Sequence, residues 1–272
     1  MQFKNKVIFI TGATRGIGRQ IALKFAEQGA TIVITGKTDK AHPKLPGTIH
    51  SVAEEVSALG GKAEPRILDV RDEQQVMYVT SEIGEKYGKI DVLINNASAI
   101  QLTDTLNTPM RKFDLMFDVN VRATFACSQA CIPYLAKAEN PHILTLSPPL
   151  NMDAKWFKDH VAYTMAKYGM SMCTLGMAEE LKSKNIAVNS LWPKTTIATM
   201  AIKVHFPEEL IQASRKPEIV ADAAYEILKK NSQEATGNFF IDEEVLRASG
   251  VTNFDQYAVN PAVPLFQDLF LS

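Results

Sequence analysis

The chain has few cysteines, and their spacing does not suit a disulfide framework. Its 272 residues include only Cys127, Cys131 and Cys173, with no Cys-x-x-Cys pair. An odd number without paired spacing indicates a reducing compartment. Cys127 and Cys131 lie four residues apart in an apolar stretch, so they would share a helix face on which a metal can bind, but buried thiols that pack as small hydrophobic groups are the commoner case. We expect such thiols and no metal site.

The chain also lacks an excess of charge and a long apolar run. It carries 29 Lys and Arg against 30 Asp and Glu, a formal net charge of -1, which creates no field to attract nucleic acid or an anionic membrane. No apolar run approaches the roughly 20 residues of a membrane span. The first run, 7–10, is too short for the hydrophobic region of a signal peptide. We expect a cytoplasmic protein that binds no nucleic acid and spans no membrane.

What the chain does have is an alternation of short β-branched runs with helical patterns. The predicted strands are 7–10, 31–35, 63–68, 90–95, 142–147, 186–191 and 236–241. The predicted helices are 17–28, 48–59, 73–87, 111–136 and 161–182, with a further helix that opens at Pro217. This order predicts parallel strands with crossover helices, and the near-continuously apolar strands indicate a sheet that is buried on both faces. We predict an α/β fold over 1–272: one domain with a doubly wound, Rossmann-like parallel sheet in three α/β/α layers.

Two stretches interrupt the alternation, and an apolar tail follows it. Residues 37–47 contain Pro43 and Pro46, and residues 195–216 form an insertion between a strand and a helix, where we expect a substrate loop. Beyond about residue 243 a tail extends to 272, and it ends in a cluster of large apolar residues, Leu265, Phe266, Leu269, Phe270 and Leu271. These side chains would dock on the core or seal a subunit interface, or else cover an apolar pocket. Ligands of doubly wound sheets bind at the carboxyl ends of the strands.

A glycine-rich turn joins the first strand to the first helix. It reads Thr11-Gly12-Ala13-Thr14-Arg15-Gly16-Ile17-Gly18. Its glycines allow a tight turn and close approach of the backbone to a pyrophosphate, and the helix N-terminus adds free N–H groups and a positive dipole end. The position between a strand and a helix of the first βαβ unit supports this interpretation. The predicted cofactor-binding residues of this turn are Gly12, Thr14, Arg15, Gly16, Ile17 and Gly18.

Basic residues beside this turn favour NADP as the cofactor. The second strand ends in Gly36-Lys37, at the position where an acidic residue would bind the ribose hydroxyls of NAD and a basic one the 2'-phosphate of NADP. Lys37 and Arg15 would hold such a phosphate by charge-assisted hydrogen bonds. Asp39 lies close enough to keep NAD possible, and both cations would then be solvated loop charges. We expect NADP.

Three residues between the first two glycines resemble the pattern of the short-chain dehydrogenase/reductase family. The resemblance implies that Asp69, followed by Val70, lies against the adenine, although Asp69 could instead cap the next helix. It also places the segment Asn95-Asn96-Ala97-Ser98 beside the cofactor. After the sixth strand it implies Pro193 and a threonine at the nicotinamide carboxamide, for which Thr196 and Thr199 both qualify. The additional cofactor residues are therefore Asp69, Val70, Asn95, Ala97, Pro193 and Thr196.

Tyr163 and Lys167 are the predicted centre of the chemistry. A spacing of four places both side chains on one helix face. A free tyrosine has a pKa near 10, so proton exchange at neutral pH benefits from roughly 4 kcal/mol of phenolate stabilisation, which a neighbouring ammonium can supply. The family resemblance completes a tetrad: Tyr163 exchanges the proton, Lys167 also binds ribose, Ser147 polarises a carbonyl and Asn120 holds a water. Ser147 lies in no nucleophile elbow, which argues against a hydrolase.

The chain departs from the family pattern in two places. Lys194 replaces a glycine after the sixth strand, and the segment 148–157 before Tyr163 is long and would line the substrate pocket. With Leu191-Trp192-Pro193-Lys194-Thr195 and the segment 42–45, these features resemble a hydroxysteroid dehydrogenase-like subgroup, some members of which carry a sterol-carrier-like domain. The resemblance implies lipid or fatty-acyl metabolism, a small apolar carbonyl or alcohol substrate, and a homodimer or homotetramer. A protein that binds NADP for regulation or as a scaffold, with little turnover, is the alternative.

Overall fold

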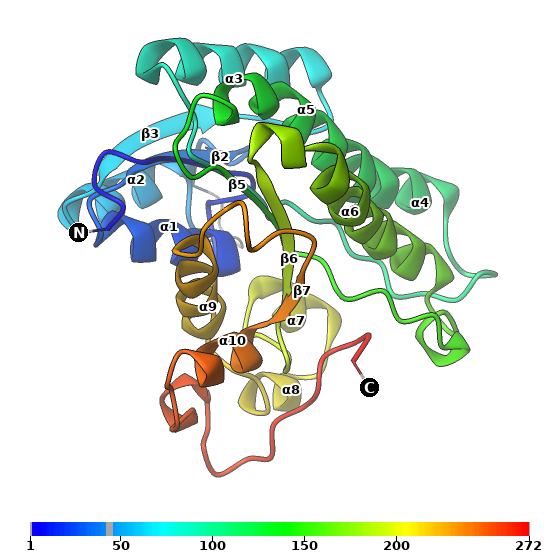
Figure 1. The fold of residues 1–272 in the computed structure, drawn as a ribbon. Helices are drawn as coiled ribbons and strands as arrows, with labels where there is room; N and C mark the ends of the chain where they lie inside the picture. The colour runs from blue at the N-terminus through cyan, green and yellow to red at the C-terminus, as the bar shows by residue number, and fades with distance from the viewer. Residues whose placement is uncertain (1, 42–45, 272) are drawn as a thin grey trace.

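Seven parallel strands form the centre of the molecule (Figure 1). The computed structural model describes residues 2–41 and 46–271, so Pro43 and the rest of the segment 42–45 lie outside the described residues. The strand order is β3-β2-β1-β4-β5-β6-β7. The strands are β1 (Val7–Ile10), β2 (Thr31–Gly36), β3 (Lys62–Ile67), β4 (Val92–Asn95), β5 (His142–Thr145), β6 (Ala187–Trp192) and β7 (Phe239–Ile241). The order changes direction between β1 and β4, and the predicted doubly wound, three-layer fold is confirmed.

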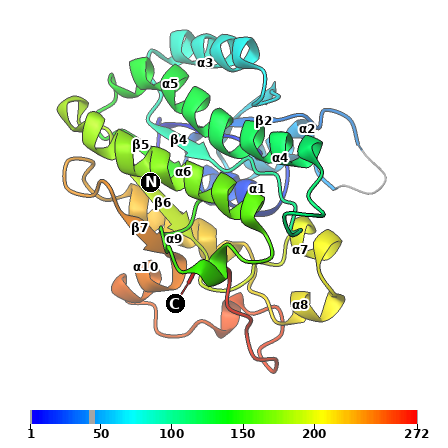
Figure 2. The same ribbon diagram turned by 90° about the vertical axis from the view of Figure 1, so that its right-hand side faces the viewer.

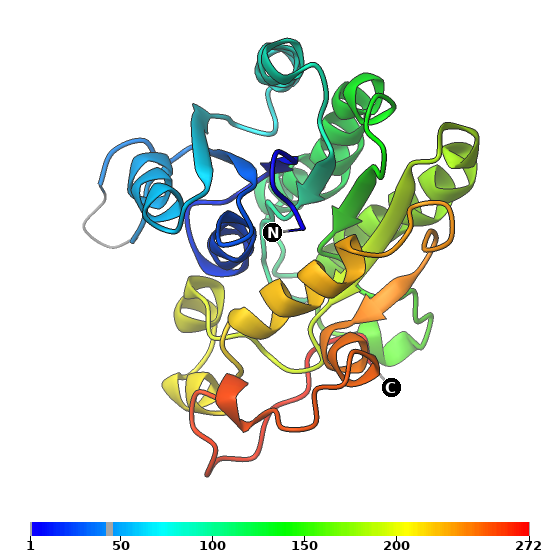
Figure 3. The same ribbon diagram turned by 60° about the vertical axis from the view of Figure 1, so that its left-hand side comes forward.

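Helices cover both faces of the sheet. One face carries α1 (Gly16–Ala26), α2 (Ile49–Ala58) and α9 (Glu218–Leu228), and the other carries α3 (Glu73–Tyr87), α5 (Ala123–Leu135) and α6 (Val161–Glu180). Figure 2 shows the second face and Figure 3 the first. In β1, Ile8 and Ile10 pack under the first layer, whereas Val7 and Phe9 pack under the second, because alternate side chains of a strand point to opposite faces. Both faces are therefore apolar.

The helix predicted over 111–136 is continuous but not uniform. It consists of α4 (Met110–Met116), a π-helical segment (Phe117–Arg122) and α5. A π-helical segment widens the turn and is frequent at functional sites. The wider turn lies at Asn120, the only buried residue of the segment.

The predicted substrate loop 195–216 contains two short helices, α7 (Met200–His205) and α8 (Glu208–Gln212). The segment beyond about residue 243, which we expected to be a tail, begins with a further helix, α10 (Asp242–Ala248), directly after β7. The remaining tail, which includes a 3-10 turn at Asp255–Tyr257, returns past α8 to the end of β6 (Figure 1). There Gln267 forms an antiparallel bridge with Thr195.

The cysteines of α5 lie in the core. Cys127 and Cys131 are buried as predicted, and burial raises the pKa of Cys127 to about 12. Within residues 2–41 and 46–271, no group of three or more His, Cys, Asp or Glu side chains is placed to hold a metal ion. In the same residues, no helix has both the length and the apolar character needed to cross a membrane.

Candidate functional site

A groove of about 540 Å³ lies at the carboxyl ends of β1 to β4, along the glycine turn. Gly12 and Gly16 have φ angles of +66° and +55°, a left-handed conformation that favours glycine. A Cβ atom at Gly12 would lie 3.0 Å from the Cα of Ala97 on the opposite wall. Most predicted cofactor residues line this groove: Gly12, Thr14, Arg15, Gly16, Ile17, Lys37, Asp69, Val70 and Ala97.

Asn96, which the sequence reasoning did not select, holds the glycine turn in place. Its Nδ2 donates to the carbonyl oxygens of Thr11 (2.9 Å) and Gly12 (3.0 Å). A Cβ at Gly18 would lie 2.4 Å from the same Nδ2, so the glycine at position 18 leaves room for the Asn96 amide. The predicted Asn95 points the other way, into the core, where its Nδ2 donates to Ser128 on α5. The sequence offered a signal for this difference, because consecutive residues along β4 face opposite sides and only one of Asn95 and Asn96 can face the glycine turn.

Arg15 joins the glycine turn to the loop after β2. Its guanidinium donates to the carbonyl oxygens of Pro46 (3.1 Å) and Gly47 (3.4 Å) and to the hydroxyl of Thr38 (3.0 Å). All three acceptors are neutral, and no described carboxylate forms an ion pair with Arg15. Burial lowers its pKa. An anion beside Arg15 would therefore meet an uncompensated positive charge.

Lys37 is exposed at the rim of the groove. Its Nζ lies 3.8 Å from Asp69, and the same carboxylate accepts hydrogen bonds from Arg71. The hydrogen bond from Arg71 is the main cause of the lowered pKa of Asp69. Asp39 does not line the groove and pairs with His50 instead (2.7 Å). The helix after β3 is capped by Asp72, so the alternative that Asp69 is its cap is wrong.

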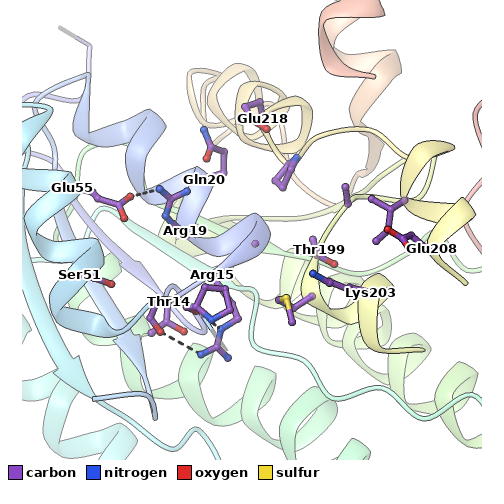
Figure 4. Close-up of a pocket in the computed structure, with 17 residues that line it drawn as sticks. Thr14, Arg15, Arg19, Gln20, Ser51, Glu55, Thr199, Lys203, Glu208 and Glu218 are labelled. Carbon is purple, nitrogen blue, oxygen red and sulfur yellow. Dashed lines mark hydrogen bonds and ion pairs between the residues drawn. The ribbon is translucent and has the colours of Figure 1, made fainter. Parts of the chain in front are cut away.

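A larger cavity of about 960 Å³ opens on the other side of the glycine turn, between α1, α2 and the two short helices (Figure 4). Arg19 and Glu55 form an ion pair in its wall. Thr14, Arg15 and Gly16 are the only predicted cofactor residues that line it. Most of the predicted cofactor residues therefore lie along the smaller groove.

Tyr163 and Lys167 face a cavity of about 180 Å³ next to the groove. The Nζ of Lys167 donates to the carbonyl oxygen of Leu146 (2.6 Å) and lies 4.9 Å from the ring centre of Trp192. Desolvation lowers the pKa of Lys167 to about 7 and raises the pKa of Tyr163. Among the described residues, no group hydrogen-bonds the Tyr163 hydroxyl, which leaves it available to a ligand. Ile17, Asn96, Ser98, Ile100 and Thr199 line both the cavity and the groove.

The other two tetrad candidates do not line this cavity. Both amide atoms of Asn120 bond the backbone of Ala99, with Nδ2 donating to its oxygen (2.9 Å) and Oδ1 accepting from its nitrogen (2.8 Å). Asn120 therefore fixes the segment after β4. The fully buried Ser147 shares a hydrogen bond with Ser190 (2.8 Å), which in turn donates to Thr174. The structure does not bring the Ser147 hydroxyl to Tyr163.

The segment after β6 forms the opposite wall of the cavity. Pro193 and Thr196, two of the predicted cofactor residues, line it, but the Thr196 hydroxyl pairs with Ser214 (2.8 Å). Thr199 lines the cavity and the groove, and lies 3.4 Å from the position of a Cβ at Gly16. Of the two threonines, only Thr199 lies where the cavity meets the groove.

The C-terminal tail closes the cavity. Phe270 is fully buried against the core, whereas Phe266 remains 53% exposed, so docking of the tail on the core is confirmed. The cavity lining includes Phe266, Gln267, Asp268 and Leu269 from this tail, so the tail also covers an apolar pocket. Asp268 was missed; its signal in the sequence is a lone carboxylate inside an apolar run.

His160 is the N-cap residue of α6. Its Nδ1 lies 2.9 Å from the Thr164 hydroxyl, and its ring packs beside Tyr163 and Phe270. Burial lowers its pKa. A neutral imidazole in this position shapes the aromatic wall.

Known proteins share this arrangement over nearly the whole chain. The chain is 58% identical to hydroxysteroid dehydrogenase-like protein 2 of Bos taurus and 56% identical to that of Homo sapiens, each over 264 residues. These alignments cover 97% of the chain and 63% of each relative, so the chain spans less than two thirds of their length. The subgroup resemblance is confirmed.

Solved structures agree with this relationship. A putative dehydrogenase from Xanthomonas campestris superposes with a TM-score of 0.97 and 48% identity, covering 100% of both chains. A short chain dehydrogenase from Mycobacterium thermoresistibile has a TM-score of 0.93 and 45% identity, covering 99% of this chain and 96% of that one. The model of the short chain dehydrogenase family matches residues 6–208. This match and the adjoining groove and tyrosine cavity place the chain in the short-chain dehydrogenase family of nicotinamide-dependent oxidoreductases.

Proposed function

We propose that the protein interconverts an alcohol and a carbonyl on an apolar, fatty-acyl-type substrate, with NADP(H) preferred over NAD(H). One observation carries the proposal. The free hydroxyl of Tyr163 and the ammonium of Lys167 share a small cavity that joins the glycine-turn groove through five common lining residues. A ligand in the groove therefore reaches the tyrosine.

The groove residues fit a dinucleotide. Left-handed glycines and the absence of a Cβ at Gly12 leave the backbone open to a pyrophosphate. Arg15 and Lys37 supply positive charge where a 2'-phosphate would lie, whereas Asp39 pairs with His50. This arrangement supports NADP over NAD. When bound, the nicotinamide supplies or accepts the hydride.

Residues of this chain transfer the proton and stabilise the phenolate that remains. Tyr163 donates its hydroxyl proton to the substrate oxygen during reduction and recovers it in the opposite direction. Because burial disfavours the phenolate, the neighbouring Lys167 ammonium is the group that stabilises it. Asn120 acts as a positioning residue, since it holds the segment at Ala99 beside the groove.

The walls of the cavity indicate an apolar substrate. Its lining is formed largely by the side chains of Ile100, Leu102, Leu146, Trp192, Ile197, Ile202, Phe206, Phe266 and Leu269. At about 180 Å³ it admits a short apolar segment around the reacting carbon. The name of the mammalian relatives refers to hydroxysteroids, but the substrate depends on the residues of the site and not on the fold.

The position of Ser147 favours a second candidate, a protein that binds NADP with little turnover. Without a hydroxyl from Ser147, the cavity lacks the carbonyl-polarising group that we predicted from the sequence. Tight NADPH binding with no reaction across a broad substrate panel would support this candidate.

The test is NADPH oxidation, followed by absorbance, over a panel of ketones, aldehydes and β-keto acyl thioesters. We expect Tyr163→Phe to abolish turnover while it leaves NADPH binding in place. Tyr78→Phe is the matched control, because Tyr78 is exposed on α3. Wild-type turnover in Tyr163→Phe would refute the mechanism.

We further propose a homodimer or homotetramer that forms through the outer surface of α5 and α6. Phe125, Met172 and Leu175 are each more than half exposed on these helices, and exposed apolar surface of this kind marks interaction sites. Light scattering tests it: Phe125→Glu with Leu175→Glu should yield monomers.

A further inference from the structure

The tail is held against the cavity by backbone hydrogen bonds as well as by side chains. The amide of Thr196 donates to the Phe266 oxygen (3.0 Å), and the amide of Asp268 donates to the Lys194 oxygen (3.1 Å). The indole of Trp192 donates to the Leu269 oxygen (3.0 Å). These bonds lie on both sides of Asp268, so its position in the cavity wall is fixed.

The Asp268 carboxyl belongs to the same cavity as Tyr163 and Lys167. One of its oxygens accepts from the amide of Leu269 (2.7 Å). Tyr163 and Lys167 on α6, and Asp242 at the start of α10, are close enough to interact electrostatically with this carboxyl. The ammonium of the nearby Lys194 is bound to Glu243. Desolvation is the main cause that raises the pKa of Asp268 to about 7, so a protonated carboxyl is accessible at neutral pH.

Most other polar side chains of the cavity are already engaged, and the remaining two residues, Ser98 and Thr199, lie where the cavity joins the groove. Thr196 pairs with Ser214, and Asn96 donates to the glycine turn. The amide of Gln267 donates to the Leu271 oxygen (3.0 Å). Ser147, the predicted second donor, bonds elsewhere in the core. A carbonyl oxygen has two lone pairs, and Tyr163 serves only one of them.

We propose that Asp268 is a catalytic residue of this site, whose protonated carboxyl donates a hydrogen bond to the substrate oxygen that Tyr163 protonates. The inference rests on the proposed function. In reduction, a hydride from the reduced nicotinamide forms the new C–H bond, the carbonyl π electrons pass to oxygen, and the Tyr163 proton completes the alcohol. Asp268 keeps its own proton and stabilises the charge that develops on the oxygen, in the role expected of Ser147.

The pH dependence of reduction distinguishes this role from a structural one. Ionised Asp268 cannot donate and neutral Lys167 cannot stabilise the phenolate, so kcat of the wild type should fall steeply, with two titrations, as pH rises through about 7. Loss of one donor to a developing oxyanion costs roughly a hundredfold or more in kcat. Asp268→Ala should show this loss at pH 6. Asp268→Asn keeps an N–H donor without titration, so it should retain activity within about tenfold at pH 6 and show a shallower fall at higher pH, from the titration of Lys167 alone. Asp255→Asn is the control, because Asp255 is an exposed carboxylate of the same tail.

A second measurement needs neither cofactor nor substrate. Carbon-13 NMR of the carboxyl groups should show one Asp titration with a midpoint near 7 that is missing from Asp268→Asn. In that variant the pKa of Tyr163, read as the phenolate absorbance that Tyr163→Phe lacks, should fall, because a negative neighbour is removed. Amide exchange of the tail should be the same in Asp268→Asn and wild type, which excludes undocking.

The outcomes separate the two proposals. Absence of turnover by the wild type across the panel overturns the proposed function, and the Asp268 inference with it. Where the wild type turns over a substrate, the inference alone is overturned if Asp268→Ala stays within about threefold at pH 6, or if kcat of Asp268→Asn falls as steeply with pH as that of the wild type. A midpoint of Asp268 near 4 in the NMR titration also overturns it.

Discussion

Replacement of Phe270 by alanine should release the tail from the cavity that contains Tyr163 without unfolding the sheet. The Phe270 ring is fully buried, and five aromatic rings pack within 6.2 Å of its centre. Loss of a buried Phe side chain costs about 3–5 kcal/mol. The backbone of Phe270 has a φ angle of +73°, a left-handed conformation that alanine must also adopt, so this strain does not offset the loss.

The loss should appear as local opening, because the tail is attached at the edge of the molecule and contributes no strand. If docking weakens by about 4 kcal/mol, the undocked population rises roughly a thousandfold, since each 1.4 kcal/mol is a factor of ten. Hydrogen exchange detects this directly. The amides of Phe266 and Asp268 are bonded to Ala213 and Lys194, and both should exchange faster by about that factor, while the amides of β1 keep their wild-type rates.

Phe266→Ala is the matched control, because it removes the same ring from the same tail at a position that is 53% exposed. It should change tail exchange by less than about tenfold, as burial of half the area contributes about 1 kcal/mol. Equal exchange in the two variants would show that the backbone bonds, and not the aromatic cluster, hold the tail. Faster exchange throughout β1 in Phe270→Ala would show that the tail is part of the global folding unit.

Three further predictions follow from the charges and hydrogen bonds of the site. Arg15→Gln should weaken NADPH binding about tenfold to a hundredfold and leave NADH binding nearly unchanged, because a charge-assisted contact to the 2'-phosphate is lost. Nucleotide fluorescence measures both affinities, and equal weakening of the two would contradict binding of the phosphate by Arg15. Ser147→Ala should destabilise the protein by about 1–3 kcal/mol in urea unfolding, because the Ser190 hydroxyl loses its buried partner; no loss would contradict the hydroxyl chain. Lys167→Met should abolish turnover but raise the thermal midpoint, by roughly 2–4 °C for each kcal/mol of desolvation cost that it removes. The gain should be largest below pH 7, where the buried lysine must bind a proton. A lower midpoint would contradict this desolvation cost.

The strands and helices were largely predictable because their signals are local. The helix 73–87 matches α3 at both ends, and the strand 7–10 matches β1. These patterns follow burial, and the central strands β1, β4, β5 and β6 of this sheet, which is covered on both faces, are buried at every residue. The π-helical segment was not predicted, since a wider turn leaves the apolar pattern of the long helix almost unchanged.

The site was predictable where the backbone alone decides it. The left-handed glycines and the spacing of four between Tyr163 and Lys167 follow from turn and helix geometry. Side-chain direction at strand ends was less accessible: Asn95 and Ser147 both point into the core, and a shift of one residue reverses the face. Asp268 could not be placed at all, because its contact with the site depends on a tail that returns to β6 from a distant part of the sequence.

The departures from the family pattern are physically connected. Lys194 stands where the family has glycine, and its backbone N–H donates to Asp242 (2.9 Å) while its oxygen accepts the amide of Asp268. Its ammonium binds Glu243, a residue that Arg215 and Arg247 also contact. Burial opposes ionisation of Glu243, but these three cations lower its pKa to about 2, so Glu243 is ionised at neutral pH.

This cluster ties the segment after β6 to the start of α10 and gives the tail a rigid edge to dock on. A flexible glycine at position 194 would supply the same backbone groups, but it would lack the side chain that joins them to Glu243. The tail in turn brings a carboxyl into a cavity that Ser147 does not reach. Lys194, the inward-facing Ser147 and the tail are therefore best understood as parts of one rearrangement, in which the second polar group beside Tyr163 comes from the C-terminal end of the chain.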